Sequence, residues 1–373
     1  MFIKLFDFIY TINETTELDL SSNNYKILPN DICKLSKLQK LWLHGNKIIK
    51  LPKNIGNLTS LKELSLSNNN LKNLPESIGD LLELEELLLF NNHITELPAS
   101  FYNLTNLKYL ELSESMLVSI SSNIGNLKLL QSLNMDNGKL TYIPEEIGNL
   151  ANLTYLSVSY NDIIELPKSI GNLKNLSCLK ISQNKLSVLP ENIGSLAQLV
   201  ELDLSRNNFL NLPKTLENLV NLKYLDLSYN ELKELPENIG NLVNLEILSA
   251  GNNRLEKLPE SIGDLLQLKK FFLNNNSLRF IPNAINNIIK SLYIYGSSYQ
   301  LNNLDSDCEI IIIHDLEDAL ENLPTGIKEL WLNTPQIPSD YIKLPFGCEI
   351  YTDKFEHYRD DSYDYCISAD SDD

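Results

Sequence analysis

The sequence predicts an α/β solenoid, in which short strand–turn–helix coils stack side by side around a shared core. Three observations predict it: a Leu/Ile-Pro pair recurring at one spacing, aliphatic residues in phase with it, and a column of asparagines of the same period. Each step between prolines is 23 residues, except for one double step in which Ser121 stands where proline is due. The prolines are Pro29, Pro52, Pro75, Pro98, Pro144, Pro167, Pro190, Pro213, Pro236, Pro259 and Pro282.

The aliphatic positions of one coil, beginning at Leu61, follow the pattern LxxLxLxxNxLxxLPxxIGxL. Alternation in residues 64–66 predicts a half-buried strand. From Ile78 onward the aliphatics are spaced by three, which indicates a short 3₁₀ or α segment with one buried face. Pro75 would open that segment, because its fixed φ and missing N–H cost little there. We expect Gly79 to allow a close approach between neighbouring coils.

These motifs resemble the leucine-rich repeat superfamily, and the LP-x-x-I-G-N-L variant is similar to the plant intracellular Ras-group-related and Scribble-type subfamilies. The resemblance covers roughly residues 1–290. It implies a horseshoe with a concave parallel sheet and a convex side of short 3₁₀ or α segments. It also implies a non-catalytic scaffold that binds a protein partner on the concave face. The subfamily implies signalling and a small GTPase-type partner by analogy alone.

The asparagine column has a structural explanation. At the bend after each strand, backbone groups lose access to water, and an amide with donors and an acceptor can satisfy them. Two positions break the column: Ser115 could substitute in part, while Gly138 could not. Residues 110–140 are therefore the weakest stretch, through either neutral drift or a functional kink. The column consists of Asn23, Asn46, Asn69, Asn92, Asn161, Asn184, Asn207, Asn230, Asn253 and Asn276.

Residues 1–14 are expected to form a half-repeat cap, because Phe2, Leu5, Ile9 and Ile12 are in phase with the second half of a coil. Twelve repeats of 23 residues fill positions 15–289. Residues 290–352 are interpreted as degenerate repeats that cap the sheet, with short strands near Ile310–Ile313, Leu330–Leu332 and Glu349–Tyr351. Part of this stretch, residues 323–332, resembles FNIP-type repeats. Residues 353–373 are acidic and are expected to be a disordered tail.

The charge and the cysteine usage indicate which partners and which cellular compartment to expect. The net charge of -18 disfavours nucleic acid and anionic membranes. No apolar stretch is long enough to span a bilayer, and no signal peptide is expected. The five cysteines are scattered, without a CxxC pair, and the cysteine-rich caps usual in extracellular relatives are missing. A cytoplasmic, monomeric protein is therefore expected.

The candidate binding residues lie six, four, two and one positions before each column asparagine, where strand side chains point away from the core. Aromatic residues and charges on such a face are typical of protein-binding anchors, although the β-propensity of aromatic residues could also explain them. The predicted contacts are Trp42, His44, Leu88, Phe90, Tyr109, Tyr155, Tyr160, Lys180, Asp203, Tyr224, Asp226, Tyr229, Ile247 and Phe272.

Nothing in the sequence indicates catalysis, a metal site or a cofactor. The chain has four histidines, none grouped with cysteines or carboxylates at ligand spacing, and it has no GxxxxGK[ST] phosphate loop. Cys178 is expected to point outward, with no histidine near enough to activate it. The alternative functions are a substrate-recognition adaptor for a larger complex such as a ubiquitin ligase, and an enzyme of the ligase type. Neither has a recognisable domain in residues 290–373.

Overall fold

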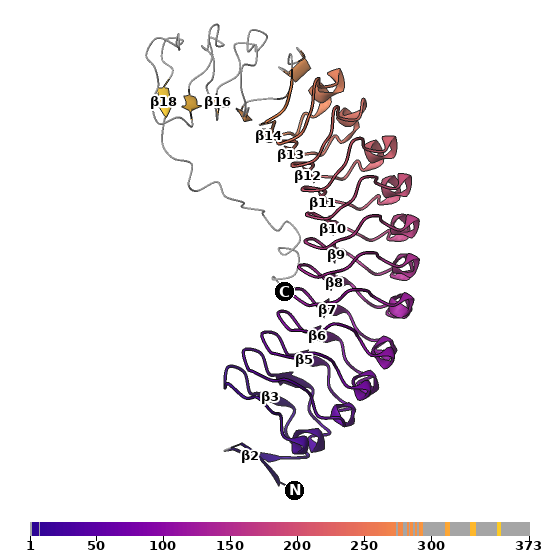
Figure 1. Cartoon of the computed structure of the whole chain (residues 1–373), viewed down its shortest axis with the longest axis vertical. Helices are drawn as coiled ribbons and strands as arrows, with labels where there is room; N and C mark the ends of the chain where they lie inside the picture. Colours follow the sequence, from indigo (N-terminus) through magenta and orange to yellow (C-terminus); the bar gives the residue numbers. More distant parts are fainter. Residues whose placement is uncertain are drawn as a thin grey trace. The chain divides into compact units, whose positions relative to one another are not determined.

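The computed structural model describes residues 2–6, 8–273, 275–278, 282, 284–285, 288, 291–293, 310–313, 329–332 and 349–351. The chain divides into two compact units, Met1–Leu176 and Ser177–Asp373. Each unit is a stack of coils with the strands on one side and the short helices on the other (Figure 1). Within the expected cap at 290–352, the strands are described, whereas the expected acidic tail at 353–373 lies outside the described residues.

In the first unit each coil contributes a strand of three residues, and each strand pairs in parallel with the next. The register joins residues 23 positions apart, as Leu41 with Leu64, so the sequence period becomes the step of the sheet. The strands are β3 (Glu17–Asp19), β4 (Lys40–Trp42), β5 (Glu63–Ser65), β6 (Glu86–Leu88), β7 (Tyr109–Glu111), β8 (Ser132–Asn134) and β9 (Tyr155–Ser157).

The second unit continues the pattern, and its later strands match those expected near residues 310, 330 and 349. The pairing offset shortens from 23 residues to 19 between β15 and β16 and between β16 and β17, and to 20 between β17 and β18. The sheet therefore continues with fewer residues between successive strands. The strands are β10 (Cys178–Lys180), β11 (Glu201–Asp203), β12 (Tyr224–Asp226), β13 (Ile247–Ser249), β14 (Lys270–Phe272), β15 (Ser291–Tyr293), β16 (Ile310–Ile313), β17 (Glu329–Leu332) and β18 (Glu349–Tyr351).

The helical segments are all 3₁₀ in the described coils, and most begin directly after a repeat proline. Pro75, for example, is extended at φ −71 and ψ 153 and precedes the first helical residue. Five residues or fewer favour the tighter 3₁₀ turn over an α-helix. The segments are η1 (Asn30–Lys34), η2 (Ile55–Asn57), η3 (Glu76–Asp80), η4 (Ala99–Asn103), η5 (Ser122–Asn126), η6 (Glu145–Asn149), η7 (Lys168–Asn172), η8 (Glu191–Ser195), η9 (Lys214–Asn218), η10 (Ile239–Asn241) and η11 (Glu260–Asp264).

Neighbouring 3₁₀ segments approach closely at the repeat glycine, as expected. A Cβ on Gly79 would lie 2.1 Å from the carbonyl oxygen of Ser100, and one on Gly194 would lie 2.2 Å from that of Thr215. Because both obstacles are backbone atoms, a side chain at Gly79 or at Gly194 would force these coils apart.

The asparagine column is a buried hydrogen-bond ladder. Asn69 donates to the carbonyls of Leu43 and Leu66, each at 2.9 Å, and its Oδ1 accepts from the N–H of Ile48 at 2.9 Å. The same set recurs at Asn92 and at Asn207. The column is therefore structural, as predicted, and it links each coil to the one before.

The column changes where its asparagine is missing. With glycine at position 138, the N–H of Leu117 is instead served by the Ser115 hydroxyl, at 3.4 Å. This bond lies within the coil of Ser115, whereas a column asparagine accepts from the preceding coil, as Asn69 does from Ile48.

The N-terminal residues differ from the expected half-coil. They form an antiparallel hairpin of β1 (Phe2–Leu5) and β2 (Phe8–Thr11). Ile3 and Leu5 face inward, whereas Phe2 and Ile9 are 71% and 70% exposed. The repeat phase therefore wrongly predicts that Phe2 and Ile9 are buried. In a hairpin, side chains alternate between the two faces with a period of two residues rather than three.

Candidate protein-binding face

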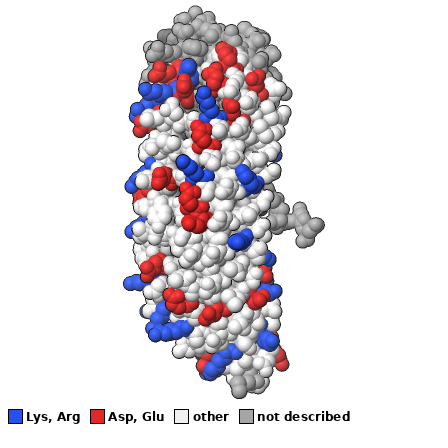
Figure 2. All heavy atoms as spheres, turned by 90° about the vertical axis from the view of Figure 1, so that its right-hand side faces the viewer, with Lys and Arg blue, Asp and Glu red and all other residues white. Residues whose placement is uncertain are grey.

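The sheet face is the set of strand side chains that point away from the leucine core. In each unit it lies on the inner side of the curve, opposite the 3₁₀ segments (Figure 1). On the outer side, Lys and Arg residues are interspersed with Asp and Glu over a largely uncharged surface, without a patch of one sign (Figure 2).

The first strands of the sheet face carry a cation–aromatic group. Trp42 is half-buried and His44 is exposed. The Nζ of Lys40 lies 6.0 Å from the centroid of the Trp42 ring and 2.8 Å from a carboxylate oxygen of Glu63. The hydrogen bond to Glu63 raises the pKa of Lys40. Lys40 thus lies beside Trp42 and is held by an acidic neighbour.

An apolar and aromatic group follows on β6 and β7. Leu88 and Phe90 are half-buried, and Tyr109 is 41% exposed. The hydroxyl of Tyr109 donates to Gln131 at 3.1 Å. Burial and the charge of Glu63 raise the pKa of Glu86 beside this group. On β9 and the turn after it, Tyr155 is half-buried and Tyr160 is exposed.

In the second unit, acidic residues and tyrosines meet on β11 and β12. The Nζ of Lys180 lies 3.3 Å from Glu201, whose side chain is buried. Asp203 is half-buried, and so are Tyr224 and Asp226, which are joined by a 3.2 Å hydrogen bond from the phenol to the carboxylate. Further along the face, Phe272 on β14 is also half-buried.

Burial, together with the charge of Asp203, raises the pKa of Asp226 to about 7. Burial and the nearby Asp226, Asp203 and Glu201 also raise the pKa of Tyr224. Both directions follow from packing acidic groups side by side with little solvent between them.

Two residues expected on the accessible face are buried. Ile247 is 9% exposed and Cys178 is fully covered. Both stand six positions before the column asparagine, and each pairs in register with a larger side chain, Glu201 beside Cys178 and Tyr224 beside Ile247. Short side chains between longer ones lose their contact with solvent, so neither residue is available for direct contact with a partner.

A rim of left-handed residues directly before the asparagine column was not anticipated. Glycine and asparagine tolerate this conformation, and they occupy about half of the rim positions. Tyr229, at φ 55, is 46% exposed, and the guanidinium of Arg206 lies 4.0 Å from its ring centroid. The rim residues are Ser22, Gly45, Asn68, Asn91, Glu114, Asn137, Tyr160, Gln183, Arg206, Tyr229, Asn252 and Asn275.

Among the described residues, no group of three or more His, Cys, Asp or Glu side chains could hold a metal ion. His314, His357, Cys308, Cys348 and Cys366 lie outside the described residues. Burial raises the pKa of the Cys33 thiol to about 11, which disfavours the reactive thiolate. Within the described part of the chain, no helix has the length and apolar character needed to cross a membrane.

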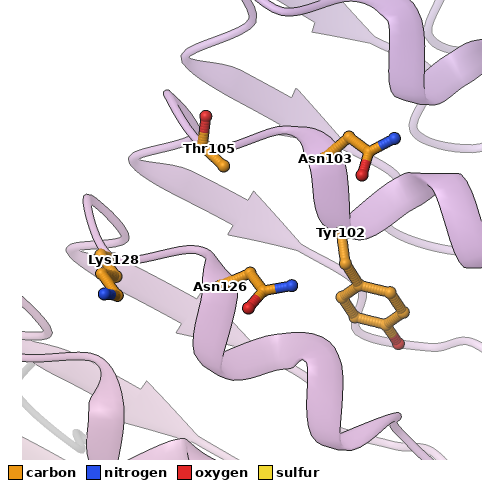
Figure 3. A pocket seen from close by; sticks show the side chains of 5 residues that line it. All are labelled: Tyr102, Asn103, Thr105, Asn126 and Lys128. Atoms are coloured by element: carbon orange, nitrogen blue, oxygen red, sulfur yellow. The ribbon is translucent and has the colours of Figure 1, made fainter.

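A shallow depression lies on the side of the coils at η4 and η5, away from the sheet face. Its lining side chains do not converge on a common point: the Tyr102 ring extends between the two 3₁₀ segments, while Lys128 points elsewhere (Figure 3). Such an arrangement does not favour a small-molecule site. The residues that line it are Tyr102, Asn103, Thr105, Asn126 and Lys128.

The repeat region matches a family model described as a leucine-rich repeat region over residues 53–141, 137–219 and 210–297, and a second, Leucine Rich Repeat, over residues 37–58. A leucine-rich repeat protein of Leptospira interrogans is 33% identical, with a TM-score of 0.73 over 89% of this chain and 83% of that one. The chain belongs to the leucine-rich repeat family. Its fold class is therefore the repeat solenoid that the period predicts. No curated protein matches it.

Two other solved structures extend the comparison. A TDR receptor is 26% identical, with a TM-score of 0.72 over 86% of this chain and 60% of that one. The internalin InlF of Listeria monocytogenes is 24% identical, with a TM-score of 0.59 over 74% of this chain and 86% of that one; this likeness concerns the fold alone. Membership in the leucine-rich repeat family supports a role in protein–protein interaction.

Proposed function

We propose that this leucine-rich repeat protein is a non-catalytic scaffold that binds a partner protein on its sheet face. The observation that carries the proposal is the display of large aromatic side chains on a face that the fold does not need to cover. Tyr109 and Tyr229 are exposed, and Trp42 and Phe90 keep part of their surface in solvent. Aromatic side chains with a polar surround are the usual anchors of protein interfaces.

We further propose that the protein is cytoplasmic and acts in signalling, with a small GTPase-type partner. It rests on the resemblance of the LP-x-x-I-G-N-L repeats to the Ras-group-related and Scribble-type subfamilies. The covered thiols of Cys33 and Cys178 are compatible with a reducing compartment.

The test is a pull-down from the native cell with the triple variant Trp42→Ala, Phe90→Ala and Tyr229→Ala. We expect the melting temperature to change little and partner recovery to fall at least tenfold, because the variant removes anchors and leaves the leucine core intact. A matched control truncates three exposed aliphatics outside the strands: Ile164→Ala, Val188→Ala and Val243→Ala. Equal recovery by both variants would contradict a sheet-face site. A ligase core among the captured proteins would favour the adaptor function instead.

A further inference from the structure

The sheet face of β11 and β12, together with the rim residue Tyr229, combines two carboxylates and two tyrosines, here called the Tyr–Asp face: Asp203, Tyr224, Asp226 and Tyr229. Asp203 and Asp226 are direct register partners on adjacent strands. Side chains in such a pair lie about 4.5–5.5 Å apart at Cβ, and like charges in this position destabilise the sheet. The face therefore holds a repulsion that folding alone does not favour.

No cation of the described second unit forms an ion pair with Asp203 or Asp226. Lys180 is engaged with Glu201 at 3.3 Å. On the other side, β13 places Ser249 beside Asp226, which offers no charge. The titratable groups that act on Asp226 are Tyr224 on its own strand and Asp203 on β11, and Glu201 on β11 acts in turn on Tyr224; all three are acidic.

A purely structural role does not require the charge. Asp203 accepts the N–H of Ser205 at 2.9 Å, and Asp226 accepts that of Ser228 at 2.8 Å. Asn134 occupies the same repeat position on β8, and its amide oxygen accepts the N–H of Asp136 in the same way, at 3.0 Å. A neutral amide therefore closes the same turn, so the turn by itself does not require a carboxylate at Asp203 or Asp226.

The tyrosines show which kind of cation the face suits. Arg206 already stacks on Tyr229 at 4.0 Å, and the ring remains 46% exposed. Tyr224 lies on the same strand as Asp226 and contacts its carboxylate. Aromatic rings beside carboxylates favour cations that carry an aliphatic stem or a flat guanidinium, which are the side chains of lysine and arginine. The net charge of -18 also attracts a basic partner from a distance.

We propose that the Tyr–Asp face binds a basic segment of the partner protein, with an arginine or lysine side chain held between Asp203 and Asp226 and flanked by Tyr224 and Tyr229. This inference rests on the proposed function and names the chemistry of the partner. The incoming cation would pair with both carboxylates in a half-buried setting, where charge-assisted hydrogen bonds are strong.

The test selects peptides from a random dodecapeptide library displayed on phage, with the whole chain as bait. We expect the enriched peptides to share a basic residue. Titration calorimetry should show at least tenfold weaker binding to the variant Asp203→Asn with Asp226→Asn, and equally weak binding when the peptide arginine is replaced by citrulline. Combining both changes should cost no more than either alone, because they remove the same interaction.

The asparagine variant is expected to fold, because Asn134 shows that the amide fits this position. Its melting temperature should equal or exceed that of the parent chain, so lost binding cannot be attributed to unfolding. The matched control, Glu63→Gln with Glu86→Gln, alters a carboxylate pair in the first unit that Lys40 already partners. We expect peptide affinity to stay within twofold of the parent in this control.

Three outcomes would overturn the inference: enriched peptides without basic residues, affinities that the asparagine variant leaves unchanged, or no enrichment at all. Peptides that instead lose binding with Trp42→Ala and Phe90→Ala would leave the proposed function standing and reject the basic partner. The selection therefore separates failure of this inference from failure of the sheet-face proposal.

Discussion

The phenol oxygen of Tyr102 accepts a hydrogen bond from the backbone N–H of Ser121, with 3.1 Å between the two atoms. Both residues depart from the repeat: Tyr102 stands where most coils have glycine, and Ser121 stands where they have proline. Proline has no N–H to donate. The missing proline and the extra aromatic ring are therefore two halves of one contact.

This contact predicts a non-additive pair of substitutions. Tyr102→Phe removes the acceptor and Ser121→Pro removes the donor, so each should lower the free energy of unfolding by about 1 kcal/mol. The double variant should cost little more than one of them, as a double-mutant cycle by urea denaturation would show. Additive losses would mean that the two residues act independently.

The asparagine ladder predicts a difference between the interior and the end of the column. Asn69→Ala leaves the N–H of Ile48 without its acceptor and removes one of the two asparagine donors from each of the carbonyls of Leu43 and Leu66. We expect a loss of about 3–5 kcal/mol. Asn23 is exposed, and its side chain donates to Ser21 alone in the described part of the chain. Asn23→Ala should therefore cost under about 1 kcal/mol. Guanidinium unfolding followed by circular dichroism would measure both.

Two serines of one column on the 3₁₀ side are expected to affect stability differently when they are replaced by alanine. Ser100 donates to the carbonyl of Glu76, the first residue of η3. The hydroxyl of Ser77, one coil earlier, is buried and has no hydrogen-bond partner within the described residues. Ser77→Ala should be neutral or stabilising, and Ser100→Ala should cost about 1 kcal/mol. Thermal melting of the two variants would decide; a large loss for Ser77→Ala would contradict the assignment.

The carboxylate of Asp226 predicts a pH dependence of stability. Its pKa in the folded chain, about 7, lies above the unfolded value near 3.9. The folded state therefore binds more protons, so this group's contribution is favourable at low pH and is lost as pH rises from about 4 to 7. Asp226→Asn should remove that slope and raise stability above pH 7 by at most about 4 kcal/mol.

The matched comparison for this prediction is Asp19, whose pKa is lowered by hydrogen bonds from Ser21. Its contribution has the opposite sign: it is present above the unfolded pKa and is lost on acidification. Asp19→Asn should therefore flatten the acid limb of the stability profile and leave the neutral region unchanged. Urea midpoints between pH 3 and pH 8 would separate the two variants.

The repeat period alone predicts the regular part of the fold. A 23-residue repeat with leucines in phase dictates the coil, the core positions, the parallel register and the buried role of Asn69, because identical coils can share a core only by stacking in phase. The close approach at Gly79 follows for the same reason. The alignment of Asp203 with Asp226 was also readable from the period, although its significance was not.

The burial of several side chains could be read only from the three-dimensional structure, because it depends on the size of the residues packed beside them. Cys178 and Ile247 occupy face positions but are covered, because Glu201 and Tyr224 lie beside them. Phe2 and Ile9 follow the repeat phase but are exposed in a hairpin. The bond between Tyr102 and Ser121 joins residues 19 positions apart. These features depend on the volume of the surrounding side chains, which the repeat pattern of the sequence does not specify.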